Sequence, residues 1–127
     1  MNEAVKENLR DINVKPLSDS INEAKIYSKA GILYFVIEES GIIQAVNAMV
    51  ESFFEMDSGD LIGKNFLDFV HDEEKSATKN AYNLLFRKGY IKNHKCRVKK
   101  SNNIHYWVDI NGIINSGESA ASIVCID

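Results

Sequence analysis

The 127-residue sequence has little proline, few cysteines and no long hydrophobic run. The two cysteines, Cys96 and Cys125, lie far apart without metal-ligand spacing, so we expect two buried thiols in a reducing compartment. The longest apolar run, Gly31 to Ile37, is well short of the roughly 18–20 residues of a membrane helix. The segment from Met1 to Arg10 is charged and lacks the apolar stretch of a secretory signal. These absences predict a cytoplasmic chain without a membrane span.

An excess of basic residues is also missing. The formal net charge is −3 and the pI is near 5.6, which argues against a nucleic-acid partner. The 45% apolar and 26% charged residues are ordinary for a soluble globular protein, and the length suits one domain. We therefore expect a single folded domain with a substantial core.

The motifs of common enzyme classes are absent as well. The sequence has no glycine-rich phosphate loop, histidine-rich metal motif or nucleophile elbow. Its three histidines are scattered: His71 precedes a helix, His105 is expected on an outer sheet face, and His94 is expected at the inner rim as a hydrogen-bonded residue. We predict a domain without catalytic activity. A small α+β enzyme stays the competing class, and it would need a polar cluster of titratable residues in a cleft.

The first 29 residues are predicted to form a helical extension that is separate from a domain at residues 30–127. Val5, Leu9 and Ile12 repeat at helical spacing before Pro16. A capping box follows at Ser20–Glu23, and a short amphipathic helix is expected from the spacing of Ile21, Ala24 and Tyr27.

The next forty residues alternate between strand and helix patterns. The expected elements are a buried strand at 31–37, a turn at 38–41, a returning strand at 42–46, a helix at 48–54 capped by Asn47, and one or two single-turn helices within 61–70. A long helix from Asp72 to about Lys88 is predicted to bury Ala77, Ala81, Leu84 and Leu85 and to end at Gly89. Strands at about 90–100, 104–114 and 119–126 complete an α+β fold with helices on one face of an antiparallel sheet.

The burial pattern sets the pairing of two of these strands. A three-residue loop, Ser101 to Asn103, places the mostly apolar pairs on one face: Val98 with Tyr106, Cys96 with Val108, and His94 with Ile110. The other face then pairs Arg97 with Trp107 and Lys95 with Asp109, a cation against an indole and an ion pair. The basic run at 92–100 is thereby explained as the outward row of a strand. Trp107 on this outer face needs cover, which we expect from the N-terminal helix and from a second copy of the chain, with Tyr27, Arg97 and Trp107 at the contact.

Several segments, in this order and spacing, make residues 30–127 similar to the PAS domain, a sensory module of histidine kinases, cyclases and transcription regulators. They are Ile32–Ile37 followed by Glu38–Ile43 and Val46-Asn47, then Leu61–His71, and the basic strand with Tyr106-Trp107-Val108. Two departures, Asp72 in place of proline and Asn102-Asn103 in place of Asp-Gly, leave the fold argument intact. The final Ile126-Asp127 resembles the start of the segment that leads into a signalling helix in this family.

The resemblance implies a five-stranded antiparallel PAS sheet with helices on one face. It also implies a sensory and dimerisation domain that relays to a C-terminal effector such as a histidine kinase. The stretch Lys64–Leu67 lacks the cysteine of flavin photosensors, and 72–88 lacks the histidine of haem-binding relatives, so neither cofactor is supported. The expected pocket between sheet and helices would take a small apolar ligand oriented by the Tyr82 hydroxyl and His94. Its lining is expected to be Phe35, Ile43, Phe66, Tyr82, Leu85, His94, Cys96 and Val108. The alternative is a ligand-free module in which these residues only fill the core.

Overall fold

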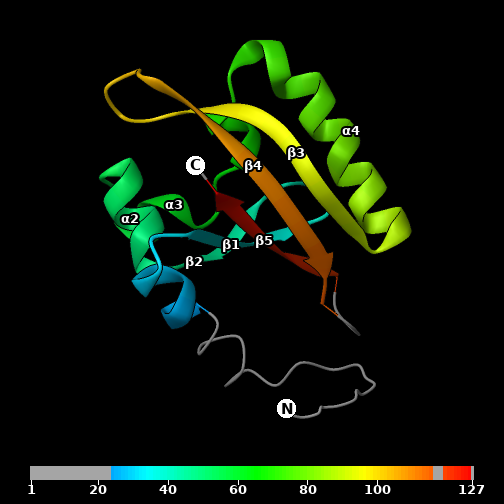
Figure 1. Ribbon diagram of the computed structural model, residues 1–127, viewed down its shortest axis with the longest axis horizontal. Coiled ribbons are helices and arrows are strands. Elements are labelled where there is room, and N and C mark those ends of the chain that lie inside the picture. Colours follow the sequence, from blue (N-terminus) through cyan, green and yellow to red (C-terminus); the bar gives the residue numbers. More distant parts are fainter. Residues whose placement is uncertain (1–23, 116–118, 127) are drawn as a thin grey trace.

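The computed structural model describes residues 24–115 and 119–126. Within these residues the chain forms one antiparallel sheet of five strands with helices packed on it, as predicted (Figure 1). The strands are β1 (Leu33–Glu38), β2 (Ile43–Val46), β3 (Tyr90–Lys99), β4 (His105–Ile114) and β5 (Ala120–Ile126). The helices are α2 (Ala48–Phe54), α3 (Ser58–Leu61), the 3-10 helix η1 (Phe66–Phe69) and α4 (Asp72–Lys88), and residues 24–29 are also helical.

The strand order across the sheet is β2-β1-β5-β4-β3. The last strand, β5, therefore lies in the centre and pairs antiparallel with both β1 and β4. The predicted helix with Val5, Leu9 and Ile12 and the capping box at Ser20–Glu23 lie outside the described residues. Within the described part of the chain, no helix has the length and apolar character needed to cross a membrane.

The β3–β4 register agrees with the burial argument at all five predicted pairs. The Arg97 guanidinium lies 5.1 Å from the centre of the Trp107 ring, and Lys95 Nζ lies 2.6 Å from Asp109 Oδ1. Asn103 has a φ of 65°, a left-handed conformation that asparagine tolerates better than most residues. A shift of one residue would have exchanged the two faces, so the alternation of burial was sufficient to define this hairpin.

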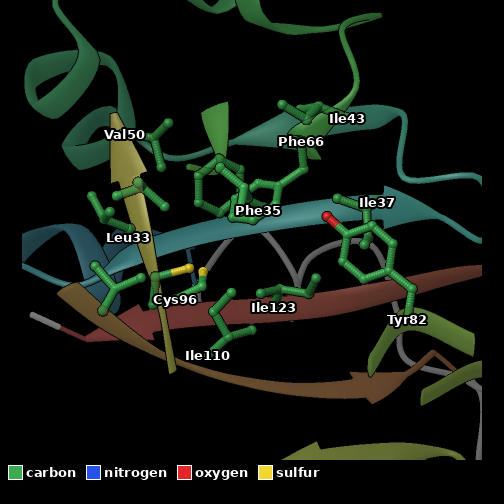
Figure 2. Packing of buried hydrophobic residues seen from close by; sticks show 14 of the residues in the cluster. Leu33, Phe35, Ile37, Ile43, Val50, Phe66, Tyr82, Cys96, Ile110 and Ile123 are labelled. Atoms are coloured by element: carbon green, nitrogen blue, oxygen red, sulfur yellow. The ribbon is translucent and has the colours of Figure 1, made fainter. Parts of the chain in front are cut away.

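One face of the sheet forms the core together with the helices. Inward side chains from all five strands meet residues of α2, α3, η1 and α4 in a single cluster (Figure 2). The strands contribute Phe35 and Ile37 from β1, Ile43 from β2, Cys96 and Val98 from β3, Val108 and Ile110 from β4, and Ile123 and Cys125 from β5. Burial of this continuous apolar face is the main stabilising contribution of the fold.

The predicted bounds of α4 are correct, but its predicted buried face is partly wrong. The residues that α4 buries are Thr78, Tyr82 and Leu85, spaced i, i+4 and i+7. Ala77 is exposed, and Ala81 and Leu84 are only half-buried. The error has a physical cause: the predicted stripe was counted from alanines and leucines and omitted Thr78, although Tyr82 was expected to face the pocket. Large side chains with one polar atom are nevertheless buried when the rest of their surface is apolar. Gly89 ends the helix at a φ of 99°, as predicted.

Asn47 makes hydrogen bonds to four residues around the start of α2. Its Oδ1 accepts from the Val50 N–H, at 3.1 Å, which confirms the predicted cap, and from the Tyr34 N–H at 3.3 Å. Its Nδ2 donates to the carbonyl oxygen of Ile32 at 2.9 Å and to that of Ala24 at 3.3 Å. One buried amide therefore joins α2, β1 and the helical residues 24–29.

We expect Asn47→Ala to lower the free energy of unfolding by about 2–3 kcal/mol, because a cap is lost and buried polar groups lose their partner. Urea unfolding followed by circular dichroism measures this change. The control is Asn83→Ala, at an exposed position of α4, which should change stability by less than about 0.5 kcal/mol. Equal effects of the two substitutions would show that the Asn47 bonds do not stabilise the fold.

Candidate functional site

Seven of the eight predicted lining residues meet in the core cluster. They come from six elements: Phe35, Ile43, Phe66, Tyr82, Leu85, Cys96 and Val108. The centre is aromatic, with the Phe35 and Phe66 rings edge to face at 5.0 Å and the Tyr82 ring 6.4 Å from that of Phe66. The eighth residue, His94, is only half-buried and lies at the rim, as its position near a strand end predicted.

The Tyr82 hydroxyl is the exceptional polar group of this core. The Tyr82 side chain comes from α4, is 2% exposed, and points inward toward Phe35 and Phe66 (Figure 2). Among the described residues, its oxygen has no hydrogen-bond partner. Burial raises the pKa of Tyr82 well above its ordinary value, and the nearby Cys125 and Cys96 add to this shift. The group is therefore a neutral hydroxyl that can donate one hydrogen bond and accept others.

An unpartnered hydroxyl is unfavourable in such a place. A buried polar group without a partner destabilises a protein by about 1–3 kcal/mol, and buried polar atoms are nearly always paired. Phenylalanine would fill the same space without this penalty. A molecule with one polar atom inside the sheet–helix layer could therefore pair with this hydroxyl and relieve the penalty.

The two thiols next to Tyr82 are unreactive. Burial raises the pKa of Cys96 to about 11, partly offset by a hydrogen bond from Thr78, and burial also raises the pKa of Cys125. Both cysteines are buried and neither forms a disulfide in the described structure. Since the thiolate is the nucleophile and the metal ligand, neutral buried thiols act as small apolar side chains here.

His94 is held by a residue that the sequence interpretation missed. Its Nε2 lies 2.8 Å from the Thr78 hydroxyl, which is itself fully buried. Burial lowers the pKa of His94, although Glu74 acts in the opposite direction. Thr78 precedes Tyr82 by one helical turn, so a helix period counted from Tyr82 would have found it. Cys125 was also missed, because the neighbours of β5 in the sheet were not predicted.

A group of possible metal ligands lies outside this core, at the start of α4. It consists of His71, Glu73 and Glu74. Arg97 already binds both carboxylates, with Nη2 2.8 Å from Glu73 Oε1 and 2.6 Å from Glu74 Oε2. The hydrogen bond from Arg97 holds the pKa of Glu74 below its usual range. His71 Nδ1 accepts from the Glu73 N–H as the helix cap. These contacts make the group a structural ion-pair network rather than a metal site.

The outer-face residues are divided between two places. Arg97 and Trp107 lie together on β3 and β4, and the Trp107 side chain remains 57% exposed. Tyr27 instead stacks on Tyr34 of β1, with 5.4 Å between the ring centres. The helical residues 24–29 therefore pack on β1 rather than over Trp107, and the rest of the N-terminal extension that was expected to cover it lies outside the described residues.

Comparison with known proteins identifies this arrangement. A family model described as the PAS domain matches residues 30–127, whereas no curated protein matches the chain. The solved PAS domain of an HTR-like protein from Haloarcula marismortui is 12% identical, with a TM-score of 0.71 over 87% of this chain and 92% of that one.

Two further solved structures share the fold. A domain of a sensory box sensor histidine kinase/response regulator from Geobacter sulfurreducens is 13% identical, with a TM-score of 0.68 over 89% of this chain and 98% of that one. The PAS domain of the RpfR quorum-sensing receptor from Cronobacter turicensis, solved in complex with BDSF, is 17% identical, with a TM-score of 0.67 over 76% of this chain and 93% of that one. Because the family model spans residues 30–127, the chain belongs to the PAS domain family of sensory modules.

Proposed function

We propose that this sensory domain binds a small, largely apolar ligand between its sheet and its helices, and that the ligand presents one polar atom to the Tyr82 hydroxyl. The observation that carries the proposal is the unpartnered hydroxyl in the centre of the core. The proposal adopts as lining Phe35, Ile43, Phe66, Tyr82, Leu85, His94, Cys96 and Val108. Solved relatives of the same fold support it, since the Cronobacter turicensis domain was solved in complex with BDSF and with C12:0.

Entry of a ligand requires the aromatic centre to open. Tyr82 is carried by α4, which contacts the sheet mainly through β3. A ligand between Phe66 and Tyr82 would separate η1 from α4 and give the hydroxyl its missing partner. His94 and Thr78 would close the rim, because their mutual hydrogen bond already joins β3 to α4. The preferred ligand is therefore apolar along its length and carries a single hydrogen-bonding atom.

The route from this site to an effector runs through β5. Ile123 and Cys125 of β5 belong to the same core cluster as Tyr82, and β5 is the central strand of the sheet. A change in core packing would therefore displace the strand that ends at Ile126. In the proposed mechanism the ligand shifts the population between two packings of β5. A C-terminal effector such as a histidine kinase would respond to that shift.

The proposed dimer uses the outer face. Trp107 is a large exposed aromatic residue, and its Arg97 neighbour is held in place by Glu73 and Glu74. A rigid arginine–tryptophan pair is a favourable centre for an interface. We propose that it forms the dimer contact together with Tyr27. We also place the domain in the cytoplasm, where its two unpaired thiols would stay reduced.

A second candidate function is a PAS dimerisation module that binds no ligand. The close contacts of Phe35 with Phe66 and with Phe54 favour it, because they already fill much of the core. The two functions differ in one respect that can be measured, the role of the Tyr82 hydroxyl.

We expect Tyr82→Phe to raise the free energy of unfolding of the ligand-free protein by about 1 kcal/mol, since an unpaired buried hydroxyl is removed. The same variant should lose the bound small molecule that native mass spectrometry detects in the original protein. Tyr106→Phe, which alters a half-buried tyrosine that lies in neither proposed site, is the control for both measurements. A Tyr82→Phe protein that is less stable and retains the same bound molecule would contradict the proposed ligand contact.

We expect Trp107→Ala to weaken self-association at least about tenfold, as loss of a central aromatic residue does in other interfaces. Its free energy of unfolding should fall by no more than about 1 kcal/mol, because the indole is largely exposed and only its contact with Arg97 is lost. Sedimentation equilibrium and urea unfolding give the two values. Ile104→Ala, at another exposed apolar residue, is the control. Unfolding of the Trp107 variant, or dimerisation at the original strength, would contradict the proposed interface.

A further inference from the structure

A groove of about 610 Å³ lies on the face of the sheet opposite to the core. Its apolar lining comes from four strands and from the helical residues 24–29: Tyr27, Tyr34, Tyr90, Ile91, Ile113 and Val124. A volume of this size, with aromatic and aliphatic walls, is typical of a small-molecule site. None of the eight residues proposed as the interior lining takes part in it. The groove is therefore a separate place for a ligand.

The floor of the groove presents apolar surface because its polar atoms are already paired. The Tyr34 hydroxyl lies 3.0 Å from Ser122 Oγ, and Ser122 Oγ donates to Asn115 Oδ1 at 2.9 Å. Tyr27 stacks on the Tyr34 ring and forms one wall. Because Tyr34 is only 3% exposed beneath Tyr27, an occupant meets mainly the side chains of Tyr27, Tyr90, Ile113 and Val124, whose apolar surface suits a hydrocarbon chain.

The end of the groove where α4 passes into β3 is polar and positively charged instead of apolar. Lys88 and Lys92 lie there, and the described lining contains no acidic residue. In the described part of the chain neither lysine has an ion-pair partner; Lys92 has only the Tyr90 ring, at 6.0 Å from its Nζ. Asn111 Oδ1 accepts from the Asn93 N–H, which leaves the Asn111 amide N–H groups as donors. The available polar groups at this end are cations and a donor, a combination that attracts an anion.

We infer that this groove binds a linear amphiphilic carboxylate, with its hydrocarbon chain along Tyr27, Ile113 and Val124 and its carboxylate between Lys88 and Lys92. The charge pattern favours this occupant, because two lysines stand at one end of an apolar lining whose described residues include no acidic side chain. Trp107 does not line the groove, so the carboxylate site and the proposed dimer contact share only Tyr27.

The test uses the full chain, labelled with ¹⁵N, and dodecanoate below its micelle concentration as the probe. We expect amide shifts at Lys88, Lys92, Ile113 and Val124 that saturate with dodecanoate. Lys88→Glu/Lys92→Glu should weaken binding at least about tenfold, because two attractive contacts become repulsive. The control Lys64→Glu/Lys79→Glu changes the net charge equally at exposed positions outside the groove and should bind dodecanoate as the original chain does.

Further comparisons distinguish a carboxylate in the groove from an uncharged ligand, from a ligand in the interior site and from a second copy of the chain. Dodecan-1-ol should bind at least about tenfold more weakly than dodecanoate, since it lacks the charge. Ile113→Asn should weaken dodecanoate binding in the groove. Tyr82→Phe should leave the dodecanoate-induced shifts at Ile113 and Val124 unchanged, because Tyr82 belongs to the interior site. Shifts confined to core residues would overturn the inference. Equal affinities of the two double-lysine variants for dodecanoate would also overturn the inference. Groove shifts that depend on protein concentration alone would overturn it as well and would identify a second copy of the chain as the occupant.

Discussion

The period-two alternation of side chains across one continuous sheet is the constraint on which this structure depends. It places Cys96, Val108 and Ile110 against the helices and leaves Arg97 and Trp107 on the opposite face. A single register satisfies both faces, because a one-residue slip would bury an ion pair and expose the core. The two candidate binding regions follow from this division. The core side offers an apolar interior with one unpartnered hydroxyl, and the outer side offers an aromatic groove with lysines at one end.

Local chemistry made several features predictable from the sequence. The cap at Asn47, the helix end at Gly89 and the turn at Asn103 each depend on a residue that suits its backbone position. The β3–β4 register was predictable because its two strands are adjacent in the chain and carry clear alternation. The strand order was not, since the pairing of β1 with β5 joins segments about eighty residues apart and has no local signature.

The candidate site was predicted only in part, because local patterns report strand alternation but not long-range packing. Inward residues of the strands were placed correctly by alternation. The buried face of α4 was misjudged at Ala77, because hydropathy ranks alanine above the buried Thr78. Thr78 could have been found one helical turn before Tyr82, whereas Cys125 needed the sheet neighbours of β5, which no local pattern gives. That the Tyr82 hydroxyl has no partner within residues 24–115 and 119–126 is a property of three-dimensional packing, and no sequence pattern reports it.

The Tyr82 hydroxyl inside a mostly apolar core links sensing to structure in this account, because a ligand that pairs with it must also repack α4 against the sheet. A crystal structure of the protein with its co-purified small molecule tests this claim most directly. The account predicts non-protein density between Phe66 and Tyr82, with one polar atom about 2.5–3.0 Å from the Tyr82 hydroxyl oxygen. A core filled by side chains alone, with that hydroxyl bonded to a protein group, would contradict it.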